Sequence, residues 1–132
     1  MNALLSLLGR LGLSLIFLIS GWGKIAGFAA TQQYMDAMGV PGALLPLVIA
    51  LELGGGLAIL SGLFTRSIAV ALALFSIASA AVFHANFADP MQAISFWKNV
   101  SMAGGFVVLA ANGAGNLSLD ALWTKRRASS TR

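Results

Sequence analysis

Apolar residues are gathered into four long runs along this chain: Ala3–Gly23, Ala43–Phe64, Ser67–Ala88 and Phe96–Gly113. Each run is close to the roughly 20 residues that an α-helix needs to cross the hydrocarbon core of a bilayer. The runs are continuously apolar and lack the alternation with period two that marks the strands of a membrane barrel. The sequence therefore predicts an all-α fold, an integral membrane four-helix bundle.

Residues that favour turns separate the runs. Val40-Pro41-Gly42 precedes the second run, Thr65-Arg66 is predicted to form a tight turn, Asp89-Pro90 to end the third helix, and Gly113-Ala114-Gly115 to end the fourth. The first run has no basic residue ahead of it and no clear A-x-A cleavage signal after it, so it is predicted to be a retained span rather than a signal peptide.

Two short helices are predicted outside the spans. Residues 31–38 place Tyr34, Met35 and Met38 on one apolar face, which is typical of a helix at the membrane interface. The segment Ser118–Arg127 combines apolar residues with a basic cluster and is predicted to lie against anionic lipid headgroups. The chain thus divides into a single four-span domain, residues 1–117, and a basic cytoplasmic tail with a short amphipathic helix, residues 118–132.

Composition supports a membrane protein and excludes several kinds of chemistry. Of the 132 residues, 58% are hydrophobic and 9% charged, and the mean hydropathy is +0.88, which leaves too little polar surface for a soluble globule. With no cysteine, the chain has no disulfide exchange and no thiolate metal site. The net charge is +4, but the basic residues form no stripe interleaved with aromatic residues. Membrane lipids are therefore the expected partners, and nucleic acid is not.

The distribution of basic residues predicts the orientation, because cytoplasmic loops carry the excess of lysine and arginine. Both termini are expected in the cytoplasm, with Lys24 and Lys98 on the outer side. The residues then assigned to the inner side are Arg66, Lys125, Arg126, Arg127 and Arg132, with Arg10 nearest that face.

Glu52 is the acidic residue within the four runs, and an ionisable group at membrane depth costs roughly 2.5 kcal/mol or more unless it has a partner. Arg10 interrupts the first run, and at about 1.5 Å per residue Arg10 and Glu52 would lie about 10 Å and 18 Å from the same membrane face. We therefore expect Arg10 and Glu52 to meet in a buried polar centre. A structural ion pair and a pair that handles protons or contacts a ligand both fit this expectation.

Helical spacing predicts which faces turn inward. One face of the first helix carries Arg10, Ser14, Phe17, Gly21 and Lys24, and Glu52 shares a stripe with Gly55, Gly56 and Ile59. A second stripe on the second run consists of small residues and is predicted to pack closely against another helix, in the bundle or in a dimer: Ala50, Gly54, Ala58 and Gly62.

A second polar group is predicted near the outer end, on three different helices: Lys24, His84, Lys98 and Asn99. These residues are the candidate ligand-binding site, a net-positive pocket suited to a quinone carbonyl, a carboxylate or a headgroup. The alternative is that the lysines extend to the membrane surface and that a backbone carbonyl satisfies the histidine. Neither a catalytic motif nor a set of metal ligands at a usual spacing is present in the sequence, so no catalytic residue and no intrinsic cofactor is predicted.

Several segments together resemble the DoxX family of small four-helix bacterial membrane proteins. They are Gly9-Arg10, Gly21-Trp22-Gly23-Lys24-Ile25, Met38-Gly39-Val40-Pro41, Leu51-Glu52-Leu53-Gly54-Gly55-Gly56 and Leu63-Phe64-Thr65-Arg66. The segments His84-Ala85-Asn86-Phe87 and Lys98-Asn99 are similar to those of the bacterial inner-membrane branch. The resemblance implies a location in the bacterial cytoplasmic membrane and, for some relatives, a role as membrane subunits of quinone-linked oxidoreductases.

Our leading hypothesis is an accessory membrane subunit that binds a quinone-like or lipidic small molecule and supports a redox partner. One alternative is a small proton-linked carrier that uses Glu52, and another is a purely structural membrane protein. Quinone is the candidate cofactor, a quinone-linked oxidoreductase the candidate partner, and assembly into a homo-oligomer stays open.

Overall fold

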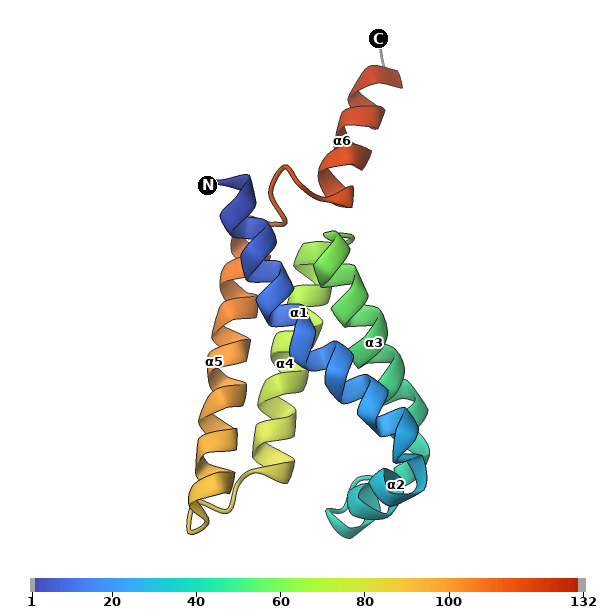
Figure 1. Cartoon of the computed structure of the whole chain (residues 1–132), viewed down its shortest axis with the longest axis vertical. Helices are drawn as coiled ribbons and strands as arrows, with labels where there is room; N and C mark the ends of the chain where they lie inside the picture. The colour runs from blue at the N-terminus through green and yellow to red at the C-terminus, as the bar shows by residue number, and fades with distance from the viewer. Residues whose placement is uncertain (1, 131–132) are drawn as a thin grey trace.

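The computed structural model describes residues 2–130, which are mainly helical and contain no strand (Figure 1). The helices are α1 (Ala3–Ala26), α2 (Phe28–Ala37), the 3₁₀ turn η1 (Gly42–Leu44), α3 (Leu45–Ser61), α4 (Thr65–Phe83), α5 (Pro90–Asn112) and α6 (Leu119–Ser130). Four segments are long and apolar enough to cross a membrane: α1, η1 with α3, α4 and α5. The predicted all-α fold with four spans is confirmed.

The spans differ from the apolar runs where local capping decides the boundary. α4 ends at Phe83 rather than at residue 88, and α5 begins at Pro90 rather than at residue 96. The Asp89 carboxylate accepts a hydrogen bond of 2.9 Å from the Met91 N–H, and Pro90 suits the first turn of a helix. Asp89-Pro90 therefore starts α5, and the prediction that this pair ends the preceding helix was wrong.

The connection between α3 and α4 also lies earlier than predicted. Thr65 is already the first residue of α4, and the turn is made by residues 62–64. Gly62 and Phe64 have φ angles of 72° and 48°, in the left-handed region that favours glycine. Phe64 therefore adopts a backbone conformation that is unfavourable in free energy for a residue with a side chain.

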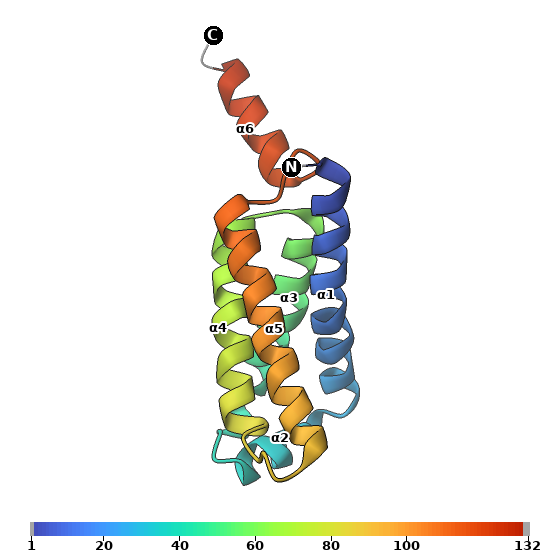
Figure 2. The same ribbon diagram turned by 90° about the vertical axis from the view of Figure 1, so that its left-hand side faces the viewer.

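The bundle is built from two helix pairs, α1 with α3 and α4 with α5 (Figures 1 and 2). A buried cluster that includes Phe17, Ile59, Leu72 and Phe106 joins the two pairs. The inward stripe predicted for the second run is confirmed, because its four residues, Glu52, Gly55, Gly56 and Ile59, are all buried. The inward face of α1 is confirmed as well, with Arg10, Ser14, Phe17 and Gly21 buried.

The stripe of small residues does not pack as predicted within this chain. Ala50 and Gly54 are exposed, and a Cβ added at Gly54 would meet no atom within 4 Å. Ala58 is half-buried, and Gly62, which is buried, lies in the turn after α3. The reason is that a helix of this bundle buries a single face, and in α3 the Glu52 stripe occupies it. A contact of the small-residue stripe with a second copy stays a prediction.

The two short helices lie at opposite ends of the bundle (Figure 1). The predicted interfacial helix is present as α2, with Met35 buried, whereas Tyr34 and Met38 are largely exposed. The predicted tail helix is present as α6, but it points away from the bundle along the long axis instead of lying across its end. Its contact with lipid headgroups stays a prediction, and Arg132, which contributed to the predicted charge bias, lies outside the described residues.

Candidate functional site

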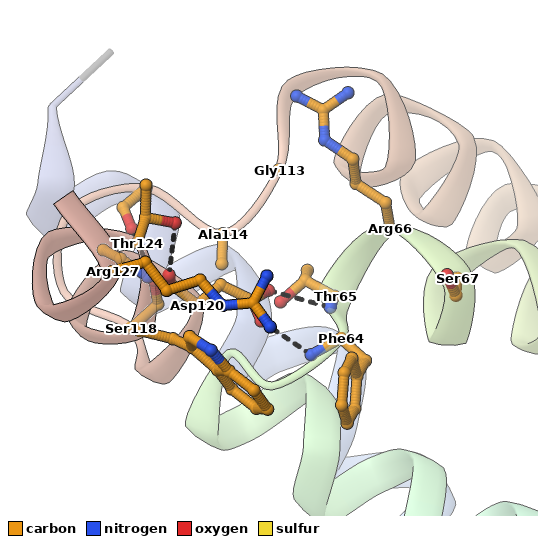
Figure 3. A pocket seen from close by; sticks show the side chains of 13 residues that line it. Phe64, Thr65, Arg66, Ser67, Gly113, Ala114, Ser118, Asp120, Thr124 and Arg127 are labelled. Atoms are coloured by element: carbon orange, nitrogen blue, oxygen red, sulfur yellow. Dashed lines mark hydrogen bonds between the residues drawn. The ribbon is translucent and has the colours of Figure 1, made fainter. Parts of the chain in front are cut away.

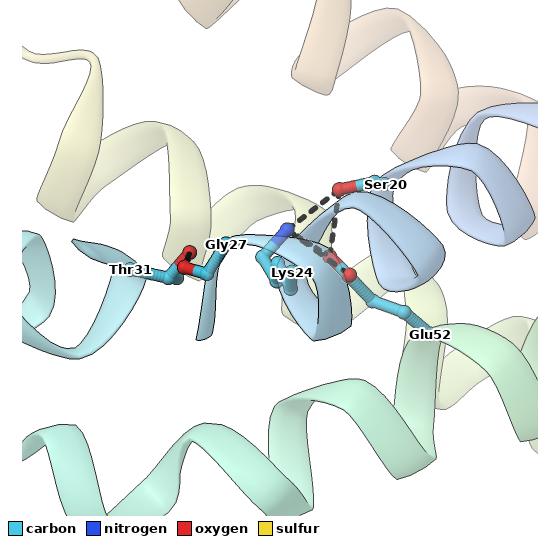
Figure 4. A network of polar contacts seen from close by, with 5 residues as sticks. All are labelled: Ser20, Lys24, Gly27, Thr31 and Glu52. Carbon is cyan, nitrogen blue, oxygen red and sulfur yellow. Dashed lines mark hydrogen bonds and ion pairs between the residues drawn. The ribbon is translucent and has the colours of Figure 1, made fainter. Parts of the chain in front are cut away.

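Glu52 is paired with a lysine of α1 (Figure 4). Its side chain is almost fully buried, and both carboxylate oxygens lie 3.0 Å from the Nζ atom of Lys24. Ser20 completes the network, because its hydroxyl oxygen accepts a hydrogen bond of 2.6 Å from the same Nζ and the hydroxyl donates to Oε1 of Glu52 at 3.4 Å. The only acidic residue of the four spans is therefore neutralised within the described part of the chain.

The predicted pair of Arg10 and Glu52 does not form, and this expectation was wrong. The guanidinium of Arg10, which is 1% exposed, donates instead to the carbonyl oxygens of Ile59 at 3.2 Å, Leu60 at 2.8 Å and Leu117. The last carbonyls of a helix have no partner inside it and attract cations. Arg10 thus caps the C-terminal end of α3 and attaches to it the chain that leads into α6.

The register of α1 against α3 explains this change of partners. A Cβ added at Gly21 would lie 2.8 Å from Cγ of Leu53 and 3.2 Å from Cβ of Glu52. Glycine at this position therefore allows the second half of α1 to approach α3 at the level of Glu52. One helical turn after Gly21 the chain reaches Lys24, so this lysine rather than Arg10 meets the carboxylate.

Asp120 lies at the same end of the bundle as Arg10. Figure 3 shows it beside Phe64 and Thr65. Its carboxylate accepts hydrogen bonds of 2.8 Å and 2.9 Å from the backbone N–H groups of Phe64 and Thr65, at the start of α4. A cavity of about 650 Å³ beside it is lined by the first residues of α4, by the connection after α5 and by α6. Sequence reasoning missed Asp120, because an aspartate in the first turn of a helix normally stabilises the N-terminus of that same helix. Here its carboxylate accepts hydrogen bonds from the start of a different helix, α4.

A second cavity, of about 300 Å³, lies among all four spans; we call it the interhelical cavity. The four residues of the predicted ligand site line this cavity together, although they come from different parts of the chain: Lys24, His84, Lys98 and Asn99. Glu52 lines it as well, whereas Arg10 does not, so only the acidic member of the predicted polar centre joins the predicted ligand site. Phe17, Phe75 and Met102 supply apolar walls. The volume is at the lower end of the roughly 300–1,000 Å³ typical of small-molecule sites.

Neighbouring side chains orient two of the site residues. The Nδ1 atom of His84 lies 2.9 Å from Oε1 of Gln92, an oxygen that only accepts, so Nδ1 donates to it. The expected backbone carbonyl is thus replaced by the side chain of Gln92, which sequence reasoning missed. The amide of Asn99 donates to the carbonyl oxygen of Ser95 at 2.9 Å. The side chain of Lys98 has no hydrogen bond or ion pair with any residue of the range 2–130.

Metal binding has no support among the described residues, since no group of three or more His, Cys, Asp or Glu side chains is placed to hold an ion. What the interhelical cavity offers is hydrogen-bond donors and one ion pair beside aromatic and aliphatic walls. This combination suits the binding of a molecule that has a polar head and an apolar body.

Comparison with known proteins gives a consistent set of relatives. The model of the DoxX family matches residues 5–85. The chain is 51% identical over 120 residues to "Inner membrane protein YqjF" of Escherichia coli (strain K12), covering 91% of this chain and 92% of that protein. It is 39% identical over 123 residues to "Inner membrane protein YphA" of the same organism, covering 88% of each.

A more distant relative carries an oxidoreductase name. "Putative oxidoreductase CatD" of Bacillus subtilis (strain 168) is 35% identical over 69 residues, which cover 52% of each chain. No solved structure gives a significant match. The family match spans Lys24, Glu52 and His84, whereas Lys98 and Asn99 lie beyond it on α5.

Proposed function

The chain belongs to the DoxX family, and on this premise we propose that it is an accessory subunit of the inner membrane that binds a quinone-like or lipidic small molecule for a redox partner. The observation that carries the proposal is the interhelical cavity, which unites Lys24, Glu52, His84, Lys98 and Asn99 within the spans. The inner-membrane names of the two Escherichia coli relatives support the location. The name of the Bacillus subtilis relative supports the link to redox chemistry.

The chemistry of a quinone fits this cavity in two ways. Its carbonyl oxygens need donors, which the ammonium group of Lys98 and the second amide hydrogen of Asn99 can supply. Its ring needs an apolar contact, which Phe17 and Phe75 can supply in offset or edge-to-face packing. With no cysteine in the sequence, oxidation or reduction of the bound molecule would be the work of the partner.

Binding is tested by titrating the purified protein in lipid nanodiscs with a short-chain quinone analogue. The parent should bind saturably, and Asn99→Leu should bind about tenfold more weakly, since one lost hydrogen bond corresponds to about 1–1.5 kcal/mol. Asn112→Leu is the matched control: Asn112 also donates to the carbonyl four residues before it, at 2.8 Å, but lies at the far end of α5. Absence of saturable binding, together with native preparations free of quinone, would reject a quinone ligand.

A proton-linked carrier is the second candidate, favoured by the carboxylate of Glu52 in a cavity inside the spans. Proton flux into liposomes that depends on a solute gradient and is abolished in Glu52→Gln would support it. Flux unchanged in this variant would assign Glu52 to ligand binding or to structure.

We further propose that the end of the bundle formed by Arg10, Arg66 and α6 faces the cytoplasm, with both termini there, and that the interhelical cavity lies toward the outer leaflet. The basic residues of α6, Lys125, Arg126 and Arg127, support this orientation because positive charge accumulates on the inner side. Reporter fusions after residue 130 and at Asp89 should report opposite compartments. A cytoplasmic signal at Asp89 would overturn the orientation.

A further inference from the structure

The interhelical cavity carries one positive charge that the chain itself does not balance. Three of its lining residues are charged in their ordinary states: Lys24, Glu52 and Lys98. Both oxygens of Glu52 lie 3.0 Å from Nζ of Lys24, so these two charges neutralise each other. The charge of Lys98 remains.

No Asp or Glu side chain of the described residues is free to neutralise Lys98. The sequence contains four acidic residues, all of them within the described range. Besides Glu52 these are Asp36, which accepts from the Gly42 N–H at 2.7 Å, Asp89, which caps its own helix, and Asp120, which caps α4 at the opposite end. Each of them is engaged elsewhere, so none of these side chains pairs with Lys98 and its ammonium group is available to an anion from outside the chain.

The position of Lys98 within a membrane span makes an apolar surrounding without a partner costly for its charge. It is the ninth residue of α5, so its Cα lies about 12 Å along the helix from the first residue. A charge at such a depth in a membrane span normally has a partner or marks a binding site. The side chain is itself exposed within the chain, which leaves the ammonium group accessible to a molecule that enters the cavity.

From this balance of charge we propose that the ligand of the interhelical cavity is an amphiphilic carboxylate and that Lys98 is its counter-ion; the inference rests on the proposed function of the cavity as a binding site. A volume of about 300 Å³ corresponds to roughly ten water molecules at about 30 Å³ each, which suits a carboxylate on a ring or short chain. The Asn99 side chain, next to Lys98 and lining the same cavity, adds a polar group beside the head. The aromatic walls contact the apolar body.

The experiment compares two ligands that differ only in charge. Decanoate and its neutral isostere decanamide are titrated against the protein in nanodiscs of zwitterionic lipid, with partition into protein-free nanodiscs subtracted, and decylubiquinone is titrated in parallel. The parent should bind decanoate at least about tenfold more tightly than decanamide, because the carboxylate forms an ion pair with the ammonium of Lys98, whereas the amide offers it only a neutral acceptor. Lys98→Gln should lose this preference, and Lys98→Arg should keep most of it.

Lys125→Gln serves as the matched control, since it removes one lysine from α6, away from the cavity. Far-UV circular dichroism checks that each variant is folded, and the Lys98→Arg protein keeps the comparison valid if Lys98→Gln does not fold. Binding of decylubiquinone without any preference for decanoate would overturn the anionic ligand and leave the proposed function in place. A preference unchanged in Lys98→Gln would overturn the role of this lysine, and failure of all three ligands would reject both proposals.

Discussion

The sharpest test of the fold concerns Arg10, which the structure uses to cap α3 rather than to neutralise Glu52. Arg10→Met keeps an unbranched apolar stem and removes the guanidinium. The carbonyl oxygens of Leu60 and Leu117 then lose the guanidinium as their donor, and that of Ile59 keeps only the Gly62 N–H, in a region from which water is largely excluded.

The expected loss of stability in Arg10→Met is the difference between the interactions that the guanidinium makes and the free energy needed to bury it. A hydrogen bond to a charged group contributes about 1.5–3 kcal/mol, and a cation at a helix C-terminus adds about 0.3–1 kcal/mol. Burying the guanidinium costs several kcal/mol, and its Nε atom has no hydrogen-bond partner among the described residues. We therefore expect Arg10→Met to lower the free energy of unfolding by about 2–4 kcal/mol. Arg10→Lys should recover about half of this, because one ammonium does not reach both chain segments.

The assay is unfolding by sodium dodecyl sulfate in mixed micelles, followed by far-UV circular dichroism. Arg66→Met is the matched control, since this arginine is exposed at the same end of the bundle, and it should change the free energy of unfolding by less than about 0.5 kcal/mol. A double-mutant cycle with Glu52→Gln should be additive within about 0.5 kcal/mol, because the two residues share no partner. Glu52 precedes Ile59 by seven residues, about 10 Å along α3. A coupling above about 1 kcal/mol, or an Arg10→Met protein as stable as the parent, would refute the assignment.

Two further predictions concern backbone and capping. Gly62→Ala should lower the free energy of unfolding by more than about 2 kcal/mol, because φ is 72° there and the new Cβ would lie 2.4 Å from Cβ of Ser118. Gly54→Ala should leave the protein at least as stable as the parent, since the new Cβ meets no atom within 4 Å and alanine favours a helix over glycine. Equal stability of the two variants in the same detergent assay would contradict this. Asp120→Ala should lower the free energy of unfolding by about 0.5–2 kcal/mol, because α4 loses its cap. Limited proteolysis should also show faster tryptic cleavage within α6. Unchanged cleavage would show that contacts other than those of Asp120 hold α6.

The number of spans and their inward faces could be predicted from the sequence because both depend on local patterns. A run of about 20 apolar residues specifies a membrane helix whatever its neighbours are. The polar and small residues at helical spacing in α1, from Arg10 to Gly21, identify a buried face for the same reason. Helix ends were harder to predict, since Asp89 and Pro90 are compatible both with the end of one helix and with the start of the next.

The partners of the charged residues were decided by the tertiary structure alone. Sequence placed Arg10, Lys24, Glu52, His84 and Lys98 in or near the membrane, and it correctly expected several of them to face the bundle interior. Which residues meet depends on the angle and register of the helices, and here the close approach of α1 to α3 at Gly21 brings Glu52 to Lys24. Arg10 then donates to carbonyls in the last turn of α3, which no sequence pattern marks as its partners. Because these contacts join segments up to about a hundred residues apart, only the folded bundle could determine them.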